Sequence, residues 1–159
     1  MRTITMRKHS CLCLRLTLVF GAALVLAAQS EHITPFTRTW KLNLAKSKFN
    51  PGPPCKSFTI TFTSDGTRHL DLIGADGQPL KASLPWSDGK EVSVQGMENA
   101  TATSKIQGRT FHDIWKQNGK VTEDVHGVVS ADEKTLKITV HATDKQGRSY
   151  HNELTFDEQ

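Results

Sequence analysis

Asp113 and Glu123 are the residues whose chemistry is most informative, because both are predicted to face the inside of a β-sheet. A glycine-ended loop at residues 117–119 predicts a hairpin that places the two side chains directly opposite each other, with Cβ atoms about 5 Å apart. Two carboxylates this close in an apolar interior cannot both ionise without cost, so one pKa should be raised. Arg68 and Lys105 are the basic residues that we expect near enough to neutralise the pair.

The carboxyl pair permits three interpretations. It could anchor the amine or hydroxyl group of an otherwise apolar ligand. It could be a salt-bridged group at a solvent-wetted rim. It could also supply the acid and base of a hydrolase, although nothing else in the chain resembles a catalytic apparatus. We therefore expect a protein that is not an enzyme and has no cofactor.

Large apolar residues at alternating positions are predicted to surround the carboxyl pair. The residues expected to contact a ligand are Asp113, Glu123, Trp115, Phe111, Trp86, Tyr150, Leu72 and Leu84. The ligand would be small and apolar or amphipathic. Alternatively, inward Phe and Trp side chains fill the interior, and the protein is a structural or protein-interaction module that works through a sheet edge or the loop at residues 51–54. A cavity below roughly 300 Å³ would exclude the carrier function.

Histidines concentrate in the last four predicted strands, on the face that points outward. The predicted register aligns one row of side chains across these strands: His112, Asp124, His141 and His151. His126 and Glu153 lie one step away on the same face. Imidazole and carboxylate groups suit zinc or copper, so the row is a candidate metal site. Chance alignment and a pH-responsive surface patch are the alternatives.

A turn signal that recurs along the chain positions all of these residues. A small or polar residue followed by Asp-Gly or Asn-Gly occurs at residues 64–66, 75–77, 87–89 and 117–119, with a variant at 145–147. Glycine supplies the left-handed backbone on which a three-residue hairpin loop ends. The first three signals are spaced by eleven and twelve residues, which is typical of strands in a meander.

These loops determine which residues face each other, and the facing residues are apolar on one side of the sheet. The expected pairs are Phe58–Leu72, Ile60–Leu70, Leu72–Leu80, Leu70–Ala82, Leu84–Val92, Ala82–Val94, Trp115–Val121, Phe111–Val125, Val129–Leu136, Val125–Val140, Ala142–Tyr150 and Ile138–Leu154. A shift of one residue would destroy this pattern. About ten strands with one apolar face predict an all-β fold, an antiparallel up-and-down meander barrel, with a two-sheet sandwich as the alternative. A single helical turn is expected near residues 45–49.

The first thirty residues have the pattern of a secretory signal peptide. A basic segment precedes an apolar run of thirteen residues, 16–28, and small residues at 28 and 30 fit a cleavage site. The run is shorter than the about 20 residues that a membrane span needs. We expect a protein exported to the periplasm or the medium, with residues 1–30 removed, no membrane contact afterwards, and a single barrel domain at residues 31–159.

Removal of the leader changes the charge. The whole chain has 20 Lys and Arg against 16 Asp and Glu, and the leader holds four of the basic residues and no acidic one. The remaining part is therefore neutral when histidine is uncharged, and it lacks the basic patch of a nucleic-acid binder. No nucleic-acid partner is expected. Cys55 alone remains of the cysteines, so no intrachain disulfide can form.

Part of the chain resembles a known family. The segment Thr39–Phe49 (TWKLNLAKSKF), the Pro-Gly-Pro-Pro loop at 51–54 and the repeated Asp-Gly hairpins are similar to small exported bacterial proteins described as lipocalin-like, which have no assigned function. The resemblance covers roughly residues 36–157. Trp40 resembles the tryptophan that closes one end of a lipocalin barrel, with Arg38 in place of the glycine of the Gly-x-Trp motif. The resemblance to this family implies a barrel like those of lipocalins and fatty-acid-binding proteins, with an interior that can hold a small apolar ligand.

Overall fold

The computed structural model describes residues 35–144 and 146–159, and the predicted signal peptide at residues 1–30 lies outside these ranges. The described chain is all-β, as predicted, with one short 3₁₀ helix, η1 (Leu44–Lys46). This helix overlaps the start of the turn expected near residues 45–49, and the rest of that segment belongs to a strand. The strands are β1 (Thr39–Leu42), β2 (Lys48–Asn50), β3 (Ser57–Phe62), β4 (Arg68–Ile73), β5 (Pro79–Leu84), β6 (Val92–Ser93), β7 (Ala100–Gln107), β8 (Thr110–Gln117), β9 (Lys120–Val129), β10 (Thr135–Thr143) and β11 (Ser149–Glu158). Within these ranges, no helix is long and apolar enough to span a membrane.

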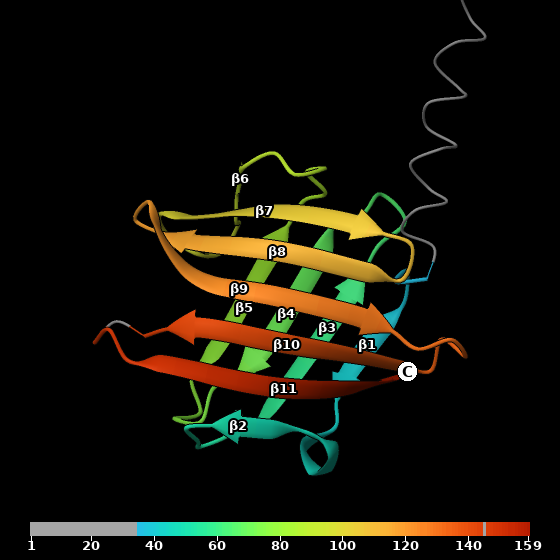
Figure 1. The fold of residues 1–159 in the computed structure, drawn as a ribbon, viewed down its shortest axis with the longest axis horizontal. Coiled ribbons are helices and arrows are strands. Elements are labelled where there is room, and N and C mark those ends of the chain that lie inside the picture. The colour runs from blue at the N-terminus through green and yellow to red at the C-terminus, as the bar shows by residue number, and fades with distance from the viewer. Residues whose placement is uncertain (1–34, 145) are drawn as a thin grey trace, which may run out of the picture.

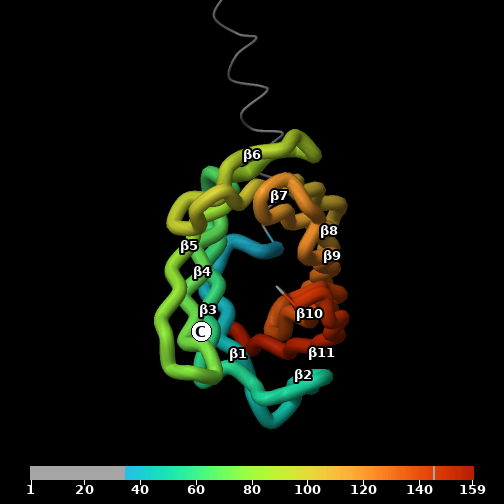
Figure 2. The backbone as a smooth tube through the Cα atoms, turned by 90° about the vertical axis from the view of Figure 1, so that its left-hand side faces the viewer, coloured from blue at the N-terminus to red at the C-terminus, as the bar shows by residue number. Residues whose placement is uncertain are grey.

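One antiparallel sheet curls into a nearly closed barrel, which confirms the predicted fold class. The strand order is β5-β4-β3-β1-β11-β10-β9-β8-β7-β6, and β2 pairs with β11 off this path. Figures 1 and 2 show β3, β4 and β5 as one wall and β7 to β11 as the other, with the strands of the two walls crossing. The ends of the sheet meet at a bridge between Ser83 and Gln95, which exchange two backbone hydrogen bonds of 2.9 Å.

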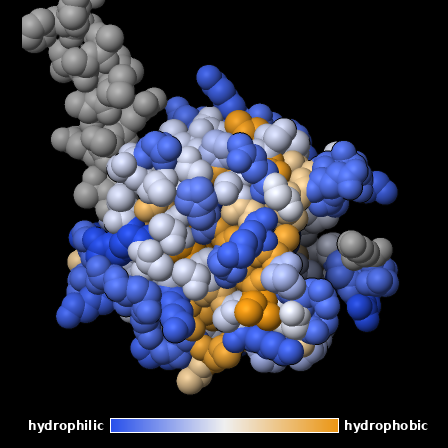
Figure 3. All heavy atoms as spheres, turned by 180° about the vertical axis from the view of Figure 1, so that it is seen from behind, coloured by the Kyte–Doolittle hydropathy of each residue, from blue (hydrophilic) through white to orange (hydrophobic). Residues whose placement is uncertain are grey.

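The predicted register is confirmed among β3, β4 and β5 in one wall and among β9, β10 and β11 in the other. Ile60 faces Leu70 in the first wall, and Ile138 faces Leu154 in the second. The other confirmed pairs are Phe58–Leu72, Leu72–Leu80, Leu70–Ala82, Val129–Leu136, Val125–Val140 and Ala142–Tyr150. These apolar side chains point into the barrel, whereas the outside of the β3–β5 wall is mainly polar, with apolar atoms showing between the polar groups (Figure 3).

The turn between β8 and β9 is one residue shorter than predicted. Asn118 and Gly119 both adopt left-handed backbone, with φ of 51° and 76°, and form a two-residue turn flanked by the pair Gln117–Lys120. Such an Asn-Gly turn matches the twist of the strands it joins. A β-bulge at Trp115 then offsets the pairing by a further residue.

The two offsets together shift β8 by two residues against β9. Because side chains alternate with a period of two, residues beyond the bulge keep their predicted face while their partners change. Val121, which lies at the offset, is exposed instead of facing the interior. The predicted pairs Trp115–Val121 and Phe111–Val125 are thus replaced by Trp115–Glu123 and Phe111–Gly127.

The predicted hairpin at residues 87–89 is also different. Asp88 and Gly89 form the turn, with φ of 47° and 77°, but the Gly89 N–H donates to the Ser104 carbonyl at 2.7 Å. The turn therefore packs against β7, and β6 pairs with β7 instead of β5. The predicted pairs Leu84–Val92 and Ala82–Val94 are wrong for this reason.

Aromatic side chains fill one end of the barrel. Trp40 and Phe36 are completely buried, and the Trp40 Nε1–H donates to the Phe36 carbonyl at 3.0 Å. The Phe36 ring lies 5.3 Å from the Phe62 ring and 5.7 Å from the Phe111 ring, measured between centroids. The Arg38 guanidinium lies 5.7 Å from the Trp40 ring. Packing at this end leaves the remaining interior space on the far side of Phe111.

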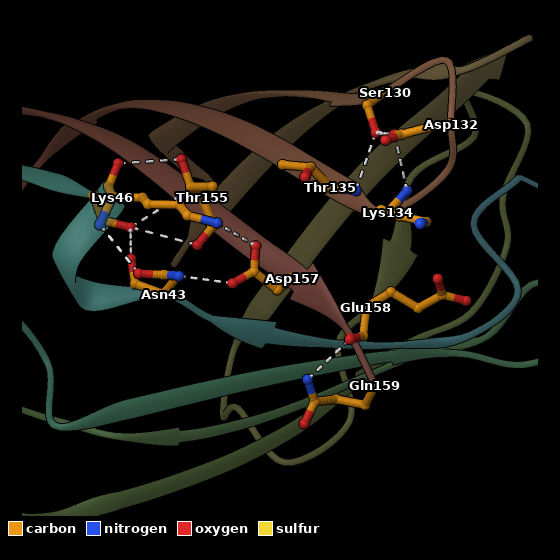
Figure 4. A network of polar contacts seen from close by, with 11 residues as sticks. Asn43, Lys46, Ser130, Asp132, Lys134, Thr135, Thr155, Asp157, Glu158 and Gln159 are labelled. Carbon is orange, nitrogen blue, oxygen red and sulfur yellow. Dashed lines mark hydrogen bonds and ion pairs between the residues drawn. The ribbon is translucent and has the colours of Figure 1, made fainter.

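Polar contacts fix η1 to β11 (Figure 4). Asn43 caps η1 by accepting from the Lys46 N–H at 3.1 Å, and its Nδ2 donates to Asp157 Oδ2 at 2.6 Å. Lys46 Nζ lies 3.0 Å from Asp157 Oδ1. The anchored turn leads directly into β2, which pairs with β11, and into the loop at residues 51–56.

Candidate functional site: a cavity inside the barrel

A cavity of about 340 Å³ lies between the two walls of the barrel. Its lining is mainly apolar and includes Phe58, Leu72 and Val140. The ionisable groups among its lining residues are Cys55, Arg68, Asp113, Glu123 and Tyr150. An apolar pocket with a few convergent polar groups is the usual architecture of a small-molecule site.

A buried ion pair lies at the inner end of this cavity. Arg68, at the start of β4, donates one hydrogen bond from each terminal nitrogen to the Asp113 carboxylate on β8, and its Nη2–Oδ1 distance is 3.1 Å. Nη2 also donates to Ser104 Oγ at 3.0 Å. The guanidinium carbon lies 4.9 Å from the Phe62 ring centroid and 4.4 Å from that of Phe111. Both oxygens of Asp113 are therefore engaged, and its charge is compensated.

The second carboxyl, Glu123, is in a different environment. Tyr150 Oη donates to Glu123 Oε1 at 3.4 Å. Burial raises the pKa of Glu123 above its ordinary value of 4.5; the Tyr150 hydrogen bond partly opposes this, and the charge of Asp113 adds to it. Within the described part of the chain, no cation contributes to this pKa. Burial and the neighbouring Glu123 also raise the pKa of Tyr150.

Glu123 and Tyr150 stand where the cavity meets the surface. Both residues line the cavity, and both also line a shallow outer depression together with Asn50, His141 and Ser149. A ligand that enters the barrel from this side passes the Glu123 carboxyl. The arrangement can therefore accept a hydrogen-bond donor or a cation at the mouth while apolar bulk lies deeper.

The raised pKa of Glu123 predicts an unusual pH dependence of stability. Between the unfolded pKa and the raised folded pKa, the native state binds more protons than the unfolded state, so the stability from this group is lost as pH rises. Glu123→Gln removes the effect, and the variant should gain stability relative to wild type as pH rises above the ordinary glutamate pKa of 4.5. Urea unfolding across this range measures the difference.

Glu91 provides the control for this prediction. Lys116 and Thr101 hydrogen-bond to Glu91 at 2.6 and 2.7 Å and hold its pKa below the ordinary value. Its contribution has the opposite sign, because it is lost as pH falls. If Glu123→Gln and Glu91→Gln changed stability in the same direction with pH, the assigned environment of Glu123 would be wrong.

The predicted ligand contacts are mostly gathered around the cavity. Those that line it are Asp113, Glu123, Trp115, Phe111, Tyr150 and Leu72. Two do not: Leu84 is buried in the core, and Trp86 lies half-buried in the loop after β5. Both residues precede the predicted hairpin at residues 87–89, which packs against β7 instead of pairing β5 with β6. Lys105, expected to face inward, is exposed.

The direct opposition of Asp113 and Glu123 is also wrong. The two-residue offset places Asp113 opposite Val125 and Glu123 opposite Trp115. Of the two predicted neutralising residues, Arg68 binds Asp113, as the sequence indicated. The two carboxyls are thus separate: Asp113 is bound by Arg68 inside the barrel, and Glu123 lies at the cavity mouth.

Several lining residues were missed by sequence reasoning. Phe49 on β2 and Pro53 and Cys55 in the following loop reach the cavity, as does Met97. The signal for Phe49 was its place in an alternating Lys-Phe-Asn strand; the loop residues carry no such signal. Burial raises the pKa of the Cys55 thiol, so this cysteine is not an activated nucleophile.

The predicted histidine row is partly confirmed. Asp124 faces His141, and His141 faces His151, as expected. His112 faces His126 instead of Asp124, again because of the offset between β8 and β9. All of these residues lie on the outside of the barrel wall, and Asp124, His141 and His151 line the outer depression at the cavity mouth.

The chain matches no protein-family model, and a comparison with curated proteins finds no significant match. The fold and the cavity are therefore the basis for the functional argument.

Proposed function

We propose that this barrel is an exported binding protein for a small, mainly apolar molecule that carries an amine or a hydroxyl group. The observation that carries the proposal is the cavity of about 340 Å³, with apolar walls and the Glu123 carboxyl at its mouth. The volume lies at the lower end of the roughly 300–1,000 Å³ range of ligand pockets, so the proposal is for a small ligand, and the apolar lining between the two walls is what favours a carrier.

The polar groups favour one chemical class of ligand. Asp113 is occupied by Arg68, so it offers no free charge to a ligand. Glu123 is partly desolvated and has a neutral phenol as its partner. Burial disfavours the charged form of the Glu123 carboxyl, and a protonated amine beside it would stabilise that charged form. A carboxylate ligand would be repelled, so we expect amines to bind best and acids worst.

A probe-displacement experiment tests the ligand class. The neutral fluorophore N-phenyl-1-naphthylamine is bound to the purified protein and displaced by octylamine, octanol or octanoate, which have the same chain length. We expect octylamine to displace most effectively and octanoate least. Glu123→Gln should abolish the preference for the amine while retaining probe binding, because the apolar walls are unchanged.

A matched pair of variants on β4 tests whether the cavity is the binding site. Leu72 lines the cavity, while Ile73 is 38% exposed on the outside. Leu72→Trp should weaken probe binding at least about tenfold, or 1.4 kcal/mol, by filling the space, and Ile73→Trp should not. Equal binding by the two variants would contradict the proposal. The intact mass of the protein from its own host checks export, since cleavage removes residues 1–30.

A further inference from the structure

Histidine side chains gather on the outer face of β8 and β9. We propose that His112, Asp124 and His126 form a surface site for a divalent transition-metal ion, Zn²⁺ or Cu²⁺. The inference does not rest on the proposed ligand site: Asp124 lines the outer depression at the cavity mouth, but His112 and His126 line neither that depression nor the cavity.

The donor atoms are already gathered. His112 Nε2 and His126 Nε2 lie 2.9 and 3.0 Å from Asp124 Oδ1, and the three potential ligand atoms lie within 4.8 Å of one another. Tetrahedral zinc with bonds of about 2.0–2.1 Å needs ligand atoms about 3.3 Å apart. The two contacts to Asp124 therefore have to lengthen by a few tenths of an ångström, while the two imidazole nitrogens, up to 4.8 Å apart, have to move closer together.

The offset between β8 and β9 creates this cluster. His112 and His126 become direct cross-strand partners, and their rings stack with centroids 4.1 Å apart and planes 8° from parallel. Asp124, two residues before His126 on the same face, reaches both rings. Parallel rings direct their nitrogen lone pairs side by side, so metal binding requires the rings to rotate toward each other. The side chains are 46% and 53% exposed, so the rotation displaces mainly water.

The chemistry of the donors selects the class of ion. Two neutral imidazoles and one carboxylate suit Zn²⁺ and Cu²⁺, whereas Ca²⁺ and Mg²⁺ prefer sites built from oxygen alone. Lys105 on β7 opposes His112, and its carbon chain packs against Gly89. Its positive charge and the exposure of the cluster both weaken affinity for a cation. We therefore expect micromolar rather than nanomolar binding.

A second histidine pair lies on the neighbouring strands. His141 Nδ1 is 3.2 Å from His151 Nδ1, and His151 Nε2 is 3.7 Å from Glu153 Oε1. His141 also faces Asp124 across the sheet, so it is placed to give a fourth ligand. The described residues contain one group of three donors within reach of a single ion, and it is the group at Asp124. The primary site is therefore assigned there.

Calorimetric titration of the protein with Zn²⁺ and with Cu²⁺ tests the assignment. The protein is purified without a histidine tag, freed of metal with a chelator and measured at about pH 7.5, because metal binding competes with protons for the ligand atoms. We expect one equivalent to bind with micromolar affinity. His112→Gln and His126→Gln should each weaken binding at least about tenfold, and His141→Gln less than about threefold.

His69→Gln is the matched control. His69 is an exposed histidine on β4 whose Nδ1 lies 2.8 Å from Ser83 Oγ, outside the cluster. This variant should bind metal as wild type does. The metal-free variants should unfold at the wild-type temperature, since all the side chains are at the surface. Metal should raise the unfolding temperature of wild type and of His69→Gln, and much less that of His112→Gln and His126→Gln. Absent binding, equal loss in His69→Gln, or loss confined to His141→Gln and His151→Gln would overturn the assignment.

Discussion

Replacing Arg68 with methionine is expected to lower the free energy of unfolding by about 3–5 kcal/mol. The variant leaves the Asp113 carboxyl, which is fully buried, without its cation and without two hydrogen bonds. It also removes one of the hydrogen-bond donors to Ser104. A loss of this size is a large part of the stability of a typical domain, so urea unfolding at neutral pH measures it directly.

Two further variants separate the buried charge from other effects. Lys81→Met breaks the exposed ion pair between Lys81 Nζ and Asp71 Oδ2, which are 2.9 Å apart, and should cost less than about 1 kcal/mol. The double variant Arg68→Met with Asp113→Leu removes both charges, and it should recover most of the loss, because an apolar pair of similar volume replaces a buried ion pair at little cost. Equal losses for Arg68→Met and Lys81→Met would contradict the buried pair.

The buried ion pair between Arg68 and Asp113 also explains how the two walls of the barrel stay linked although a cavity lies between them. Arg68 joins the β3–β5 wall to Asp113 and Ser104 of the opposite wall. The Phe62 and Phe111 rings hold the guanidinium from the aromatic end. The two walls are thus linked at the inner end of the cavity, and the space beyond can stay open at the mouth, where Glu123 and Tyr150 lie.

Local rules predicted the parts of the fold that glycine turns determine. The Asp-Gly turn at residues 64–66 gives the pairs around Ile60 and Leu70, because glycine takes the left-handed position and alternation then orders the flanking residues. The same reasoning holds for β9, β10 and β11. It fails at Asn118-Gly119, since a two-residue and a three-residue loop share this signal and the bulge at Trp115 carries none. It also fails at Asp88-Gly89, because that turn packs against β7 instead of pairing β5 with β6.

Contacts across the barrel depend on more than strand pairing. Sequence reasoning could name Arg68 as a partner of Asp113, but the choice between Arg68 and Lys105 depends on how β4 lies across from β8. The cavity mouth depends on the loop at residues 51–56, whose path follows from the anchoring of η1 and β2 on β11. The predicted histidine row differs from the observed cluster because His112 and Asp124 lie on β8 and β9, the two strands whose observed register differs from the predicted one.

The register of β8 against β9 is supported by the fit of Phe111 over Gly127. In the predicted register a valine, Val125, would have faced Phe111. In the structure the partner is Gly127, and the Phe111 ring lies where a side chain at 127 would begin. A Cβ added at Gly127 would overlap Cε1 and Cζ of the ring and lie 2.6 Å from Cδ1. An aromatic ring that covers a glycine on a neighbouring strand compensates for its missing side chain.

Substitution of Gly127 is therefore the second change with a large expected effect. Gly127→Ala should destabilise the protein by about 1–3 kcal/mol, and Gly127→Val by at least about 3 kcal/mol, through overpacking. Phe111 cannot move away easily, because it is 2% exposed and is packed between Phe36, Phe62 and the Arg68 guanidinium. Urea unfolding of both variants measures the graded loss.

The cause of this loss can be tested through the ring itself. Phe111→Leu opens space above residue 127. Gly127→Val should therefore cost less stability in a Phe111→Leu background than in the wild-type protein. Val128→Ala, at a 48% exposed outward position on the same strand, should change stability by no more than about 0.5 kcal/mol. A Gly127→Val variant as stable as wild type would mean that Phe111 does not lie over this glycine. The predicted register, with Val125 facing Phe111, would then be the better description of β8 and β9, and the cluster of His112 with His126 would have to be abandoned with it.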